Sequence, residues 1–434
     1  MTDSQGATRP ASKNAAMLSL LKRRDFRTLW LAQAISWSGD HFTFLALMIV
    51  LNQATGSAGA IALLMSVMTV PSLLFGMLAG VFVDRWDRKQ VMVVSDVIRG
   101  VLSLALIWAA TSEHIWMIFP LAFVIASVGV FFGPARGAVM KTILAPDDLL
   151  PANILLQVTF RVTLVVGPAL AGVVIGVFGP APAFAFDGIT FLVAAALVTT
   201  MVVPRLVRSD GESLSGQSAF WRDFREGLSF IGASRTIRGL LMVMTVVSLA
   251  TGAINALFVP LLMNVLNVGA TAIGLADSAQ GIGMIGGAVI AAAVQRFRPN
   301  WVIAGGLLAA SIIIIAIGLA PTYLVVIVLS LLVGLAIGPI EATIPALMQR
   351  IVPLDKMGRV GGTMNTSQSV ATLASMGAAG ALADIVGIRW IFVIAGAIGI
   401  VAGLIAISAI SEGHAQQQAG AGIQPSLQPV EDNE

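Results

Sequence analysis

Long apolar runs recur along almost the whole chain, and short polar or charged segments separate them. The run from Leu29 to Leu51 is long enough to cross a bilayer once as a helix, at about 1.5 Å per residue. Runs of about 20 apolar residues predict about twelve such spans. Their expected limits are 28–52, 57–83, 90–111, 115–140, 149–178, 181–203, 237–266, 270–294, 300–320, 322–348, 359–386 and 388–410. The pattern therefore predicts an all-α membrane protein.

One long polar connection, residues 204–236, divides the predicted spans into two groups. It begins as a Ser- and Gly-rich linker. Its second half carries charged residues between four apolar residues at helical spacing, Phe220, Phe224, Leu228 and Ile231. This pattern predicts an amphipathic helix on the membrane surface. The expected parts are an N-terminal tail (1–27), an N-terminal six-helix half (28–203), the linker (204–236), a C-terminal six-helix half (237–410) and a C-terminal tail (411–434).

Basic residues between the spans lie almost entirely in alternate connections. They precede span one and follow spans two, four, eight and ten, and Arg389 is the exception to this alternation. By the positive-inside rule, the linker, both tails and every even-to-odd connection are expected to be cytoplasmic. The polar first residues contain no apolar core followed by a cleavage site, so we expect the first helix itself to direct insertion.

The composition agrees with membrane embedding and excludes several kinds of functional site. Of the 434 residues, 57% are hydrophobic and 11% are charged, whereas a soluble domain typically carries about 25% charged residues. The absence of cysteine excludes disulfides and thiolate metal sites, and the 3 histidines are too scattered for a metal cluster. The sequence pI is about 9.7, but the basic residues are divided among short connections, so we expect no nucleic-acid partner. We expect no cofactor, and the sequence contains no P-loop for ATP.

The connection after span two carries a motif. It reads GVFVDRWDRKQVM and resembles the G-x-x-x-D-R-x-G-R-K motif of the major facilitator superfamily. The matching residues are Gly80, Asp84, Arg85, Arg88 and Lys89, and Asp87 replaces the usual glycine. The resemblance implies a twelve-helix major facilitator fold with two six-helix halves related by pseudo-twofold symmetry. The halves also resemble each other, because FFGPARGAV in span four matches AIGPIEATI in span ten and places Arg136 opposite Glu341.

The resemblance also implies a role for this charged connection. In that family it latches the cytoplasmic side shut in the outward-open state, and here its partner is expected near residues 358–362. Gly80 is expected to permit close helix packing, and Asp84 to cap the positive end of another helix. Asp96 and Arg99 in span three are expected to pair, with a structural or gate role. The alternative is a basic connection that only sets topology.

Further motifs are distributed over nearly the full length of the chain: ISWSGD in span one, SDVIRG in span three, FFGPARGA in span four, PANILLQ before span five and REGLSFI in the linker. By these motifs the chain resembles the drug-exporter branch of this superfamily, which contains macrolide-efflux and enterobactin-exporter-like proteins. This resemblance implies a multi-pass protein of the bacterial cytoplasmic (inner) membrane. Gly167, Pro168 and Gly172 in span five resemble an antiporter signature, G-P-x-x-G-G, although such residues often serve packing and kinking.

Polar side chains inside the spans are the candidate transport residues, because a charge at the midplane costs roughly 2.5 to 3.5 kcal/mol on an insertion scale. Asp40, halfway along span one, is expected to load and release a proton. The alternative is a permanent structural pair, for example with Arg161. His41 is expected to point toward a neighbouring helix. The other candidates are Asn153, Gln157 and Arg161 as one stripe facing the cavity or a carboxylate such as Asp40, then Arg136, Asp277, Glu341, Asn365 and Gln368.

These residues and the resemblance predict a secondary active exporter, not an enzyme, that exchanges protons for amphiphilic organic solutes by alternating access. Its expected partners are a small-molecule substrate, protons and the lipid bilayer, and it is expected to act as a monomer. One alternative is a dedicated exporter of a siderophore or another endogenous metabolite. Another is a membrane-embedded enzyme that uses Asp147 and Asp148, although an acidic turn before span five explains that pair more simply. A third alternative is a non-transporting receptor, but the latch would then have no conformational change to control.

Overall fold

The structure is a computed structural model of the chain. It describes residues 17, 19–111, 115–204, 225, 229–232, 234–294, 298–353 and 356–409. Twelve helices within these residues are long and apolar enough to cross a membrane, so the prediction of an all-helical membrane protein is confirmed. Most of the two predicted tails and of the predicted amphipathic linker helix lies outside the described residues.

The spanning helices follow the predicted runs closely. In the first half they are α2 (Arg24–Thr55), α3 (Ala58–Arg85), α4 (Arg88–Thr111), α5 (Ile118–Ile143), α6 (Pro146–Phe178) and α7 (Ala181–Thr199). In the second half they are α9 (Arg235–Pro260), α10 (Ala270–Val294), α11 (Pro299–Leu319), α12 (Tyr323–Ile351), α13 (Met357–Val386) and α14 (Ile388–Ala409). A short 3₁₀ helix, η1 (Ile115–Met117), precedes α5, and a π-helical turn, η2 (Leu261–Val265), follows α9. Several helices extend about one turn past the apolar run, because a helix can continue into polar sequence beyond the hydrocarbon.

Local sequence explains how one helix ends and the next begins. Gly56 has a φ of 62°, and its N–H donates to the Asn52 carbonyl at 2.8 Å, which ends α2. Glycine suits this left-handed position because it has no Cβ. The next residue, Ser57, accepts a hydrogen bond from the Ala60 N–H and caps the start of α3. A two-residue turn is therefore enough to reverse the chain.

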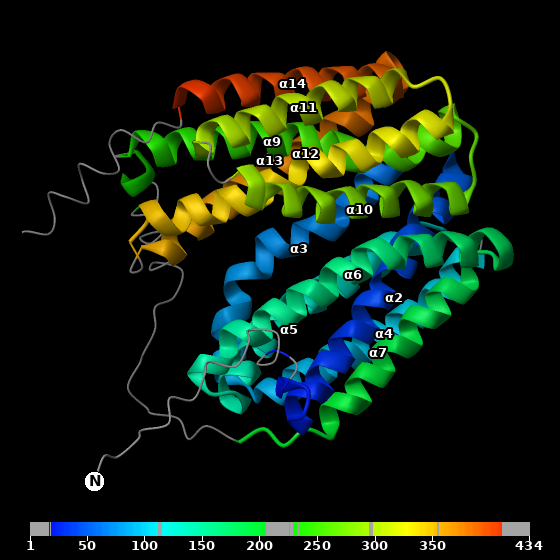
Figure 1. The fold of residues 1–434 in the computed structure, drawn as a ribbon. Helices are drawn as coiled ribbons and strands as arrows, with labels where there is room; N and C mark the ends of the chain where they lie inside the picture. The colour runs from blue at the N-terminus through cyan, green and yellow to red at the C-terminus, as the bar shows by residue number, and fades with distance from the viewer. Residues whose placement is uncertain are drawn as a thin grey trace, which may run out of the picture.

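The two halves pack their helices in the same pattern (Figure 1). Helix α2 contacts α6 and α7, and α9 correspondingly contacts α13 and α14. Helix α4 packs on α5 and α7, as α11 packs on α12 and α14. Between the halves, α6 contacts α10 and α3 contacts α13. This pairing is the twofold-related arrangement that the sequence repeat predicted.

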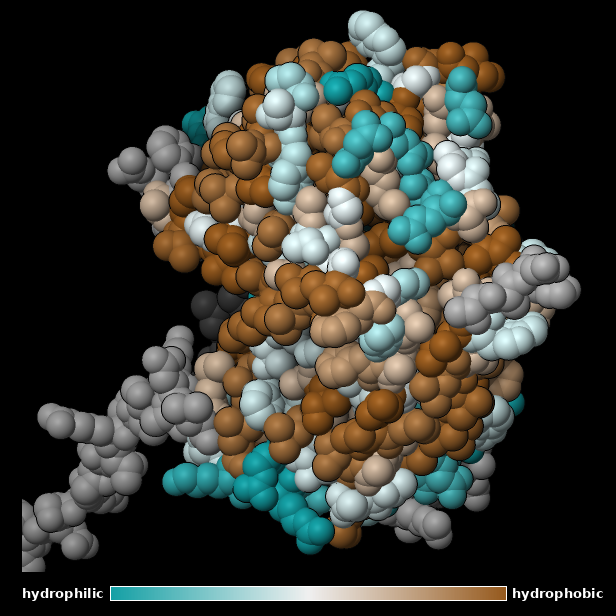
Figure 2. Space-filling model, turned by 90° about the vertical axis from the view of Figure 1, so that its right-hand side faces the viewer, coloured by the Kyte–Doolittle hydropathy of each residue, from teal (hydrophilic) through white to brown (hydrophobic). Residues whose placement is uncertain are grey.

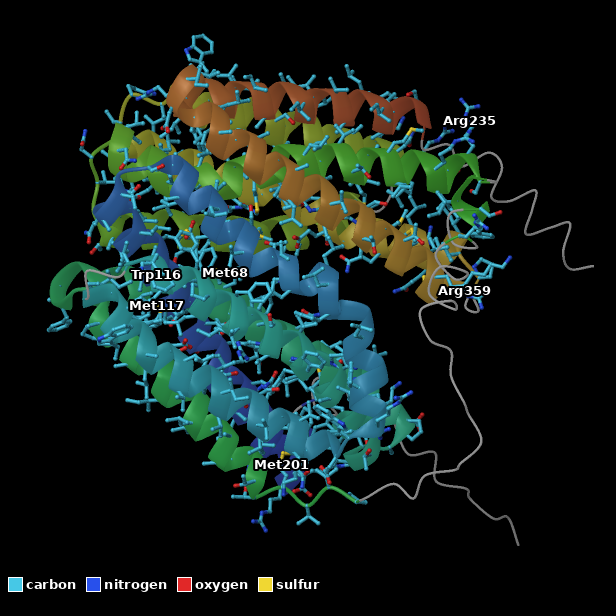
Figure 3. The ribbon with its side chains drawn as sticks, turned by 180° about the vertical axis from the view of Figure 1, so that it is seen from behind. Met68, Trp116, Met117, Met201, Arg235 and Arg359 are labelled. Carbon is cyan, nitrogen blue, oxygen red and sulfur yellow. The ribbon has the colours of Figure 1, made fainter. Side chains whose placement is uncertain are left out.

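The two bundles meet at one end of the molecule and diverge toward the other (Figure 1). We call the end with the start of α2, the end of α7 and the start of α9 the linker end, and the opposite end the far end. Figure 2 looks onto the far end, where the surfaces of the two halves meet. In Figure 3, Met201 and Arg359 lie at the linker end on separate halves. At the far end, the Asn52 side-chain amide donates to Asn264 Oδ1 at 2.7 Å and joins α2 to η2.

Glycines allow the close contacts that close the far end. A Cβ on Gly172 of α6 would lie 2.8 Å from the Ala270 carbonyl oxygen and 3.1 Å from the Gly274 Cα, both in α10. A Cβ on Gly59 of α3 would lie 3.4 Å from the Gly380 carbonyl oxygen of α13. Toward the linker end of α3 and α13, glycines at 76, 80, 358, 361 and 362 have no atom within 4 Å of their Cβ positions. Helices that touch at the far end are thus separate at the linker end.

Within the first half, α4 and α7 cross at a pair of glycines. A Cβ on Gly100 would lie 3.0 Å from the Gly188 carbonyl oxygen and 3.0 Å from the Leu192 Cγ. We expect Gly100→Ala to lower the free energy of unfolding by about 1 to 3 kcal/mol, because the two helices must move apart. Gly305→Ala in α11, where a Cβ meets nothing within 4 Å, is the matched control and should not destabilise the protein. Melting temperatures in detergent test this, and equal shifts for the two variants would contradict it.

Candidate transport site

Asp40 of α2 belongs to an ionic cluster inside the first half. Arg99 of α4 donates from Nη2 to Asp40 Oδ1 at 2.8 Å, and its Nη1 lies 3.9 Å from Asp96 Oδ1. The predicted Asp96–Arg99 pair is therefore present, but Asp40 is the closer acid. The Arg99 guanidinium carbon also lies 3.9 Å from the centre of the Phe191 ring in α7. One guanidinium thus joins α2, α4 and α7.

A third carboxyl group of this cluster, that of Asp187 of α7, was not among the predicted residues. Its Oδ2 accepts a hydrogen bond from the Ser103 hydroxyl at 2.8 Å, and its Oδ1 accepts none among the described residues. A Cβ on Gly39 would lie 2.6 Å from this Oδ1, so the carboxyl group abuts α2 next to Asp40. Asp187 is the lone acid of the apolar run AFAFDGITF. The criterion that singled out Asp40, an ionisable residue inside a span, would have found it.

The members of the cluster differ in their access to the surface. The exposed fraction is 42% for the Asp40 side chain and 14% for that of Arg99, whereas Asp96 and Asp187 are buried at 0% and 1%. Helix α2 contacts helices of both halves. Asp40 is therefore the most exposed carboxyl group of the cluster, and it lies on a helix that reaches both halves.

His41 points away from the cluster, as predicted. A Cβ on Gly167 of α6 would lie 2.8 Å from the His41 Cγ, which means that the imidazole packs where Gly167 has no side chain. Five residues on, Gly172 admits α10, and a Cβ on Gly274 would lie 2.9 Å from the Pro168 carbonyl carbon. The residues that resemble the antiporter signature therefore make close packing contacts in this conformation.

A second ion pair crosses between the halves. Arg161 of α6 donates from Nη2 to Glu341 Oε2 of α12 at 2.6 Å. The two side chains are 40% and 41% exposed, so water reaches both. The alternative pairing of Asp40 with Arg161 is wrong, because the Asp40 carboxylate is paired with Arg99 of the same half. Arg161 faces a carboxylate, as predicted, but that carboxylate belongs to the other half.

Arg136 and Glu341 correspond in the sequence repeat but have different partners. Arg136 of α5 donates from Nη1 to Gln33 Oε1 at 2.8 Å, and its guanidinium carbon lies 5.4 Å from the Trp37 ring centre. No carboxylate pairs with it in the described part of the chain. The Trp37 and Phe160 rings in turn form a T-shaped pair, with centroids 5.4 Å apart. A cation and two aromatic rings therefore lie together on α2, α5 and α6.

The remaining amide and acidic candidates are more dispersed. Asn153 and Gln157 are exposed on α6, and Asn153 donates to the Leu149 carbonyl of its own helix at 2.8 Å. On α13, Asn365 is exposed, and Gln368 donates to the Met364 carbonyl at 3.3 Å. Asp277 of α10 is partly buried and pairs with no described residue. The structure does not bring Asp277 to either ion pair.

The acidic pair considered as an enzyme site starts a helix. Asp147 and Asp148 lie in the first turn of α6, where negative charge favours the helix dipole. Asp148 Oδ2 also lies 2.7 Å from Arg23 Nη2. These contacts account for both acids as part of the linker end.

The charged connection between α3 and α4 is ordered by capping. Asp87, which stands where the motif has glycine, accepts the Gln90 N–H at 3.1 Å at the start of α4. Lys89 Nζ donates to the Thr199 and Met201 carbonyls at 2.8 and 2.7 Å and so caps the end of α7. Arg389, the exception to the charge alternation, likewise donates to the carbonyls that end α11 at the far end.

The structure describes only part of the predicted latch. Gly80 has nothing within 4 Å of its Cβ position, so the close packing expected there is absent. The side chain of Asp84 lies outside the described part of the structure, and Arg85 is exposed. The latch belongs to a state closed at the linker end and remains a prediction.

Comparison with known proteins identifies the wider group. Residues 15–428 match a family described as transmembrane secretion effector. The chain is 24% identical over 372 residues to "Uncharacterized MFS-type transporter YkuC" of Bacillus subtilis, covering 83% of this chain and 86% of that one. It is 24% identical over 381 residues to "Macrolide efflux protein A" of Streptococcus pyogenes, covering 86% and 92%.

Solved structures share the fold at low sequence identity. A bacterial homologue of the human lysosomal transporter Spinster, described as inward-facing and unoccupied, matches with a TM-score of 0.70 at 16% identity, covering 93% of this chain and 98% of that one. A POT family transporter in complex with 5-aminolevulinic acid matches with a TM-score of 0.70 at 11% identity, covering 89% and 96%.

Proposed function

Because the chain belongs to the transmembrane secretion effector family, we propose that it is a secondary active exporter that exchanges protons for amphiphilic organic solutes. The observation that carries the proton-coupled part is the Asp40–Arg99 pair, in which a carboxylate at the middle of a spanning helix is 42% exposed. Such a group can take up a proton and change the partner of its arginine. A carboxylate that alternates between proton and guanidinium links solute movement to a proton gradient.

The orientation follows from charge. Basic residues concentrate in the connections of the linker end, so we assign that end to the cytoplasm and place the protein in the bacterial cytoplasmic membrane with both termini inside. The separated helices at the linker end and the glycine contacts at the far end then correspond to an inward-open state. In this state solute enters from the cytoplasm. The path lies between the halves of one chain, which is consistent with a functional monomer.

The residues along this path suit an amphiphilic solute. Trp37 and Phe160 supply aromatic surface, and Arg136 beside them is a cation without a described carboxylate partner. Glu341 and Arg161 add one charge of each sign, both accessible to water. The similarity to a protein named for macrolide efflux supports export of organic solutes.

Uptake into inside-out membrane vesicles tests the proposal. The panel should contain macrolide-like compounds, lipophilic cations and siderophore-like chelators, with a proton gradient imposed and then collapsed. We expect several amphiphilic members to accumulate and to leave when the gradient collapses. Accumulation of one metabolite alone would favour the dedicated exporter, and accumulation that ignores the gradient would contradict proton coupling.

The Arg161–Glu341 pair gives a further prediction. We expect Glu341→Gln to slow export while the melting temperature stays nearly unchanged, because an ion pair this exposed contributes only about 0 to 1 kcal/mol to stability. The exchange Arg161→Glu with Glu341→Arg separates two roles. Recovery of export in the exchanged protein indicates a contact between the halves, and no recovery indicates contact with solute. Initial export rates are the measurement, and a wild-type rate for Glu341→Gln would remove the pair from the transport site.

A further inference from the structure

One group of charged residues inside the first half contains more carboxyl groups than cations. We call Asp40, Asp96, Arg99 and Asp187 the acidic cluster. It holds three carboxyl groups and one guanidinium, and the guanidinium is 2.8 Å from Asp40 and 3.9 Å from Asp96. Both Asp96 oxygens and the Asp187 Oδ1 accept no hydrogen bond in the described structure. Two buried acids are therefore left with little compensation.

No other charged group among the described residues compensates these acids. From α2, His41 packs against α6 at Gly167. From α5, the backbone at Gly129 faces Arg99 but brings no charge, and Arg136 is bonded to Gln33. From α6, Arg161 is bonded to Glu341. The described residues also contain no group of three or more acids or histidines placed to hold a metal ion.

An uncompensated carboxylate is costly in this setting. Removing an ion from water costs several kcal/mol unless a counter-charge and hydrogen bonds replace the water. Asp96 and Asp187 are 0% and 1% exposed, and the Gly100–Gly188 crossing brings α4 and α7 together beside them. Where interacting acids cannot all ionise, they share protons. The ligand that this cluster accommodates is a proton.

We propose that Asp187 is a second proton-binding residue of this transporter, which holds a proton while Arg99 is paired with Asp40. The proposal rests on the proton coupling proposed above. When a proton neutralises Asp40, Arg99 loses its closest acid and turns to the carboxyl groups of Asp96 and Asp187. Asp187 then gives up its proton, which leaves to the cavity water past Asp40. With Asp96 protonated throughout, one carboxylate faces the guanidinium before and after the exchange, first that of Asp40 and then that of Asp187, and one proton enters the cluster for each proton that leaves.

Asp187→Asn is the direct test, because asparagine has the shape of the protonated acid and carries no exchangeable charge. We expect near-normal melting, continued exchange of labelled solute across proteoliposomes, and loss of accumulation driven by a pH gradient. In the infrared spectrum of the purified protein, a protonated-carboxyl stretching band present in the wild type should be missing. Asp384→Asn, at an exposed acid of α13, is the matched control and should keep all four properties.

The outcomes separate this inference from the function on which it rests. If solute accumulation by the wild type does not depend on the pH gradient, the proposed function fails. If the pH gradient drives accumulation equally in the wild type and in Asp187→Asn, only the role of Asp187 fails. A lowered melting temperature with the infrared band retained would also overturn it, because Asp187 would then be an ionised structural partner. If Asp187→Asn does not fold, Ser103→Ala keeps the carboxyl group but removes its hydroxyl donor; it should change the pH profile of export, and an unchanged profile would overturn the inference.

Discussion

Replacing Asp40 by asparagine is expected to abolish export driven by a pH gradient while leaving solute exchange measurable. The asparagine is neutral and nearly isosteric, so it fixes the state in which Asp40 carries a proton. Arg99 then loses the acid at 2.8 Å but keeps Asp96 at 3.9 Å, and the Asp187 carboxyl group lies beside the same helices. Removing one partner of a buried pair typically costs about 3 to 5 kcal/mol. We expect a smaller loss here, because a neighbouring acid can ionise in its place.

Two measurements on purified protein check this prediction: proton release on solute addition and the melting temperature. The wild type should release protons, and Asp40→Asn should release none while melting near the wild-type temperature. Asp384→Asn, which removes an exposed acid from the second half, is the control. Unchanged proton release in Asp40→Asn would remove Asp40 from the mechanism and make Glu341 the next candidate.

Gly80→Leu is expected to arrest the protein in the open conformation and to abolish transport. Gly80 lies near the linker end of α3, and its Cβ position has nothing within 4 Å. A leucine therefore fits the open conformation without strain. It would obstruct the approach of α13 that closes the linker end, because side-chain bulk prevents the glycine-mediated contact that these helices make at the far end.

The chain contains no cysteine, so a single introduced cysteine can report the conformation. In an Asn365→Cys background, Gly80→Leu should keep the thiol reactive toward a membrane-impermeant reagent supplied from the linker end, with the melting temperature unchanged. Gly305→Leu is the matched control, because α11 packs mainly on α12 and α14 of its own half and Gly305 also has open space. Wild-type export by Gly80→Leu would show that close packing of the helices at this position is not required.

The fold was predictable because the bilayer restricts the backbone. In hydrocarbon every backbone polar group needs a partner within the segment, so an apolar run of sufficient length becomes a helix. The run that contains Asp40 illustrates this, since the helix spans it entirely and extends to Arg24. Span seven ends close to its predicted limit, but the π-helical form of its last turn after Pro260 was not predicted, because it depends on local geometry that hydropathy does not report.

The partners of the charged residues were not predictable in the same way. Asp40 bonds to Arg99, which is 59 positions away, and the choice between Arg99 and Arg161 depends on how each helix is rotated in its bundle. Hydropathy constrains this rotation poorly when helices are apolar on most faces. Contacts set by short-range helix geometry were easier to predict from the sequence, as the Asp96–Arg99 spacing and the direction of His41 illustrate. Asp87 stands where the motif has glycine. The reason for this replacement could be given only from the structure, in which the Asp87 carboxylate caps the start of α4.

Proteoliposomes that contain the purified protein, a transported solute and a pH-sensitive dye on each side give the most direct test of proton-coupled export. The orientation should be fixed so that the linker end faces the outer buffer. With the lumen made acidic, the account predicts that solute moves into the lumen as protons move out, and that a solute gradient alone drives protons in the opposite direction. Solute movement with no opposing proton flux in either experiment would contradict it.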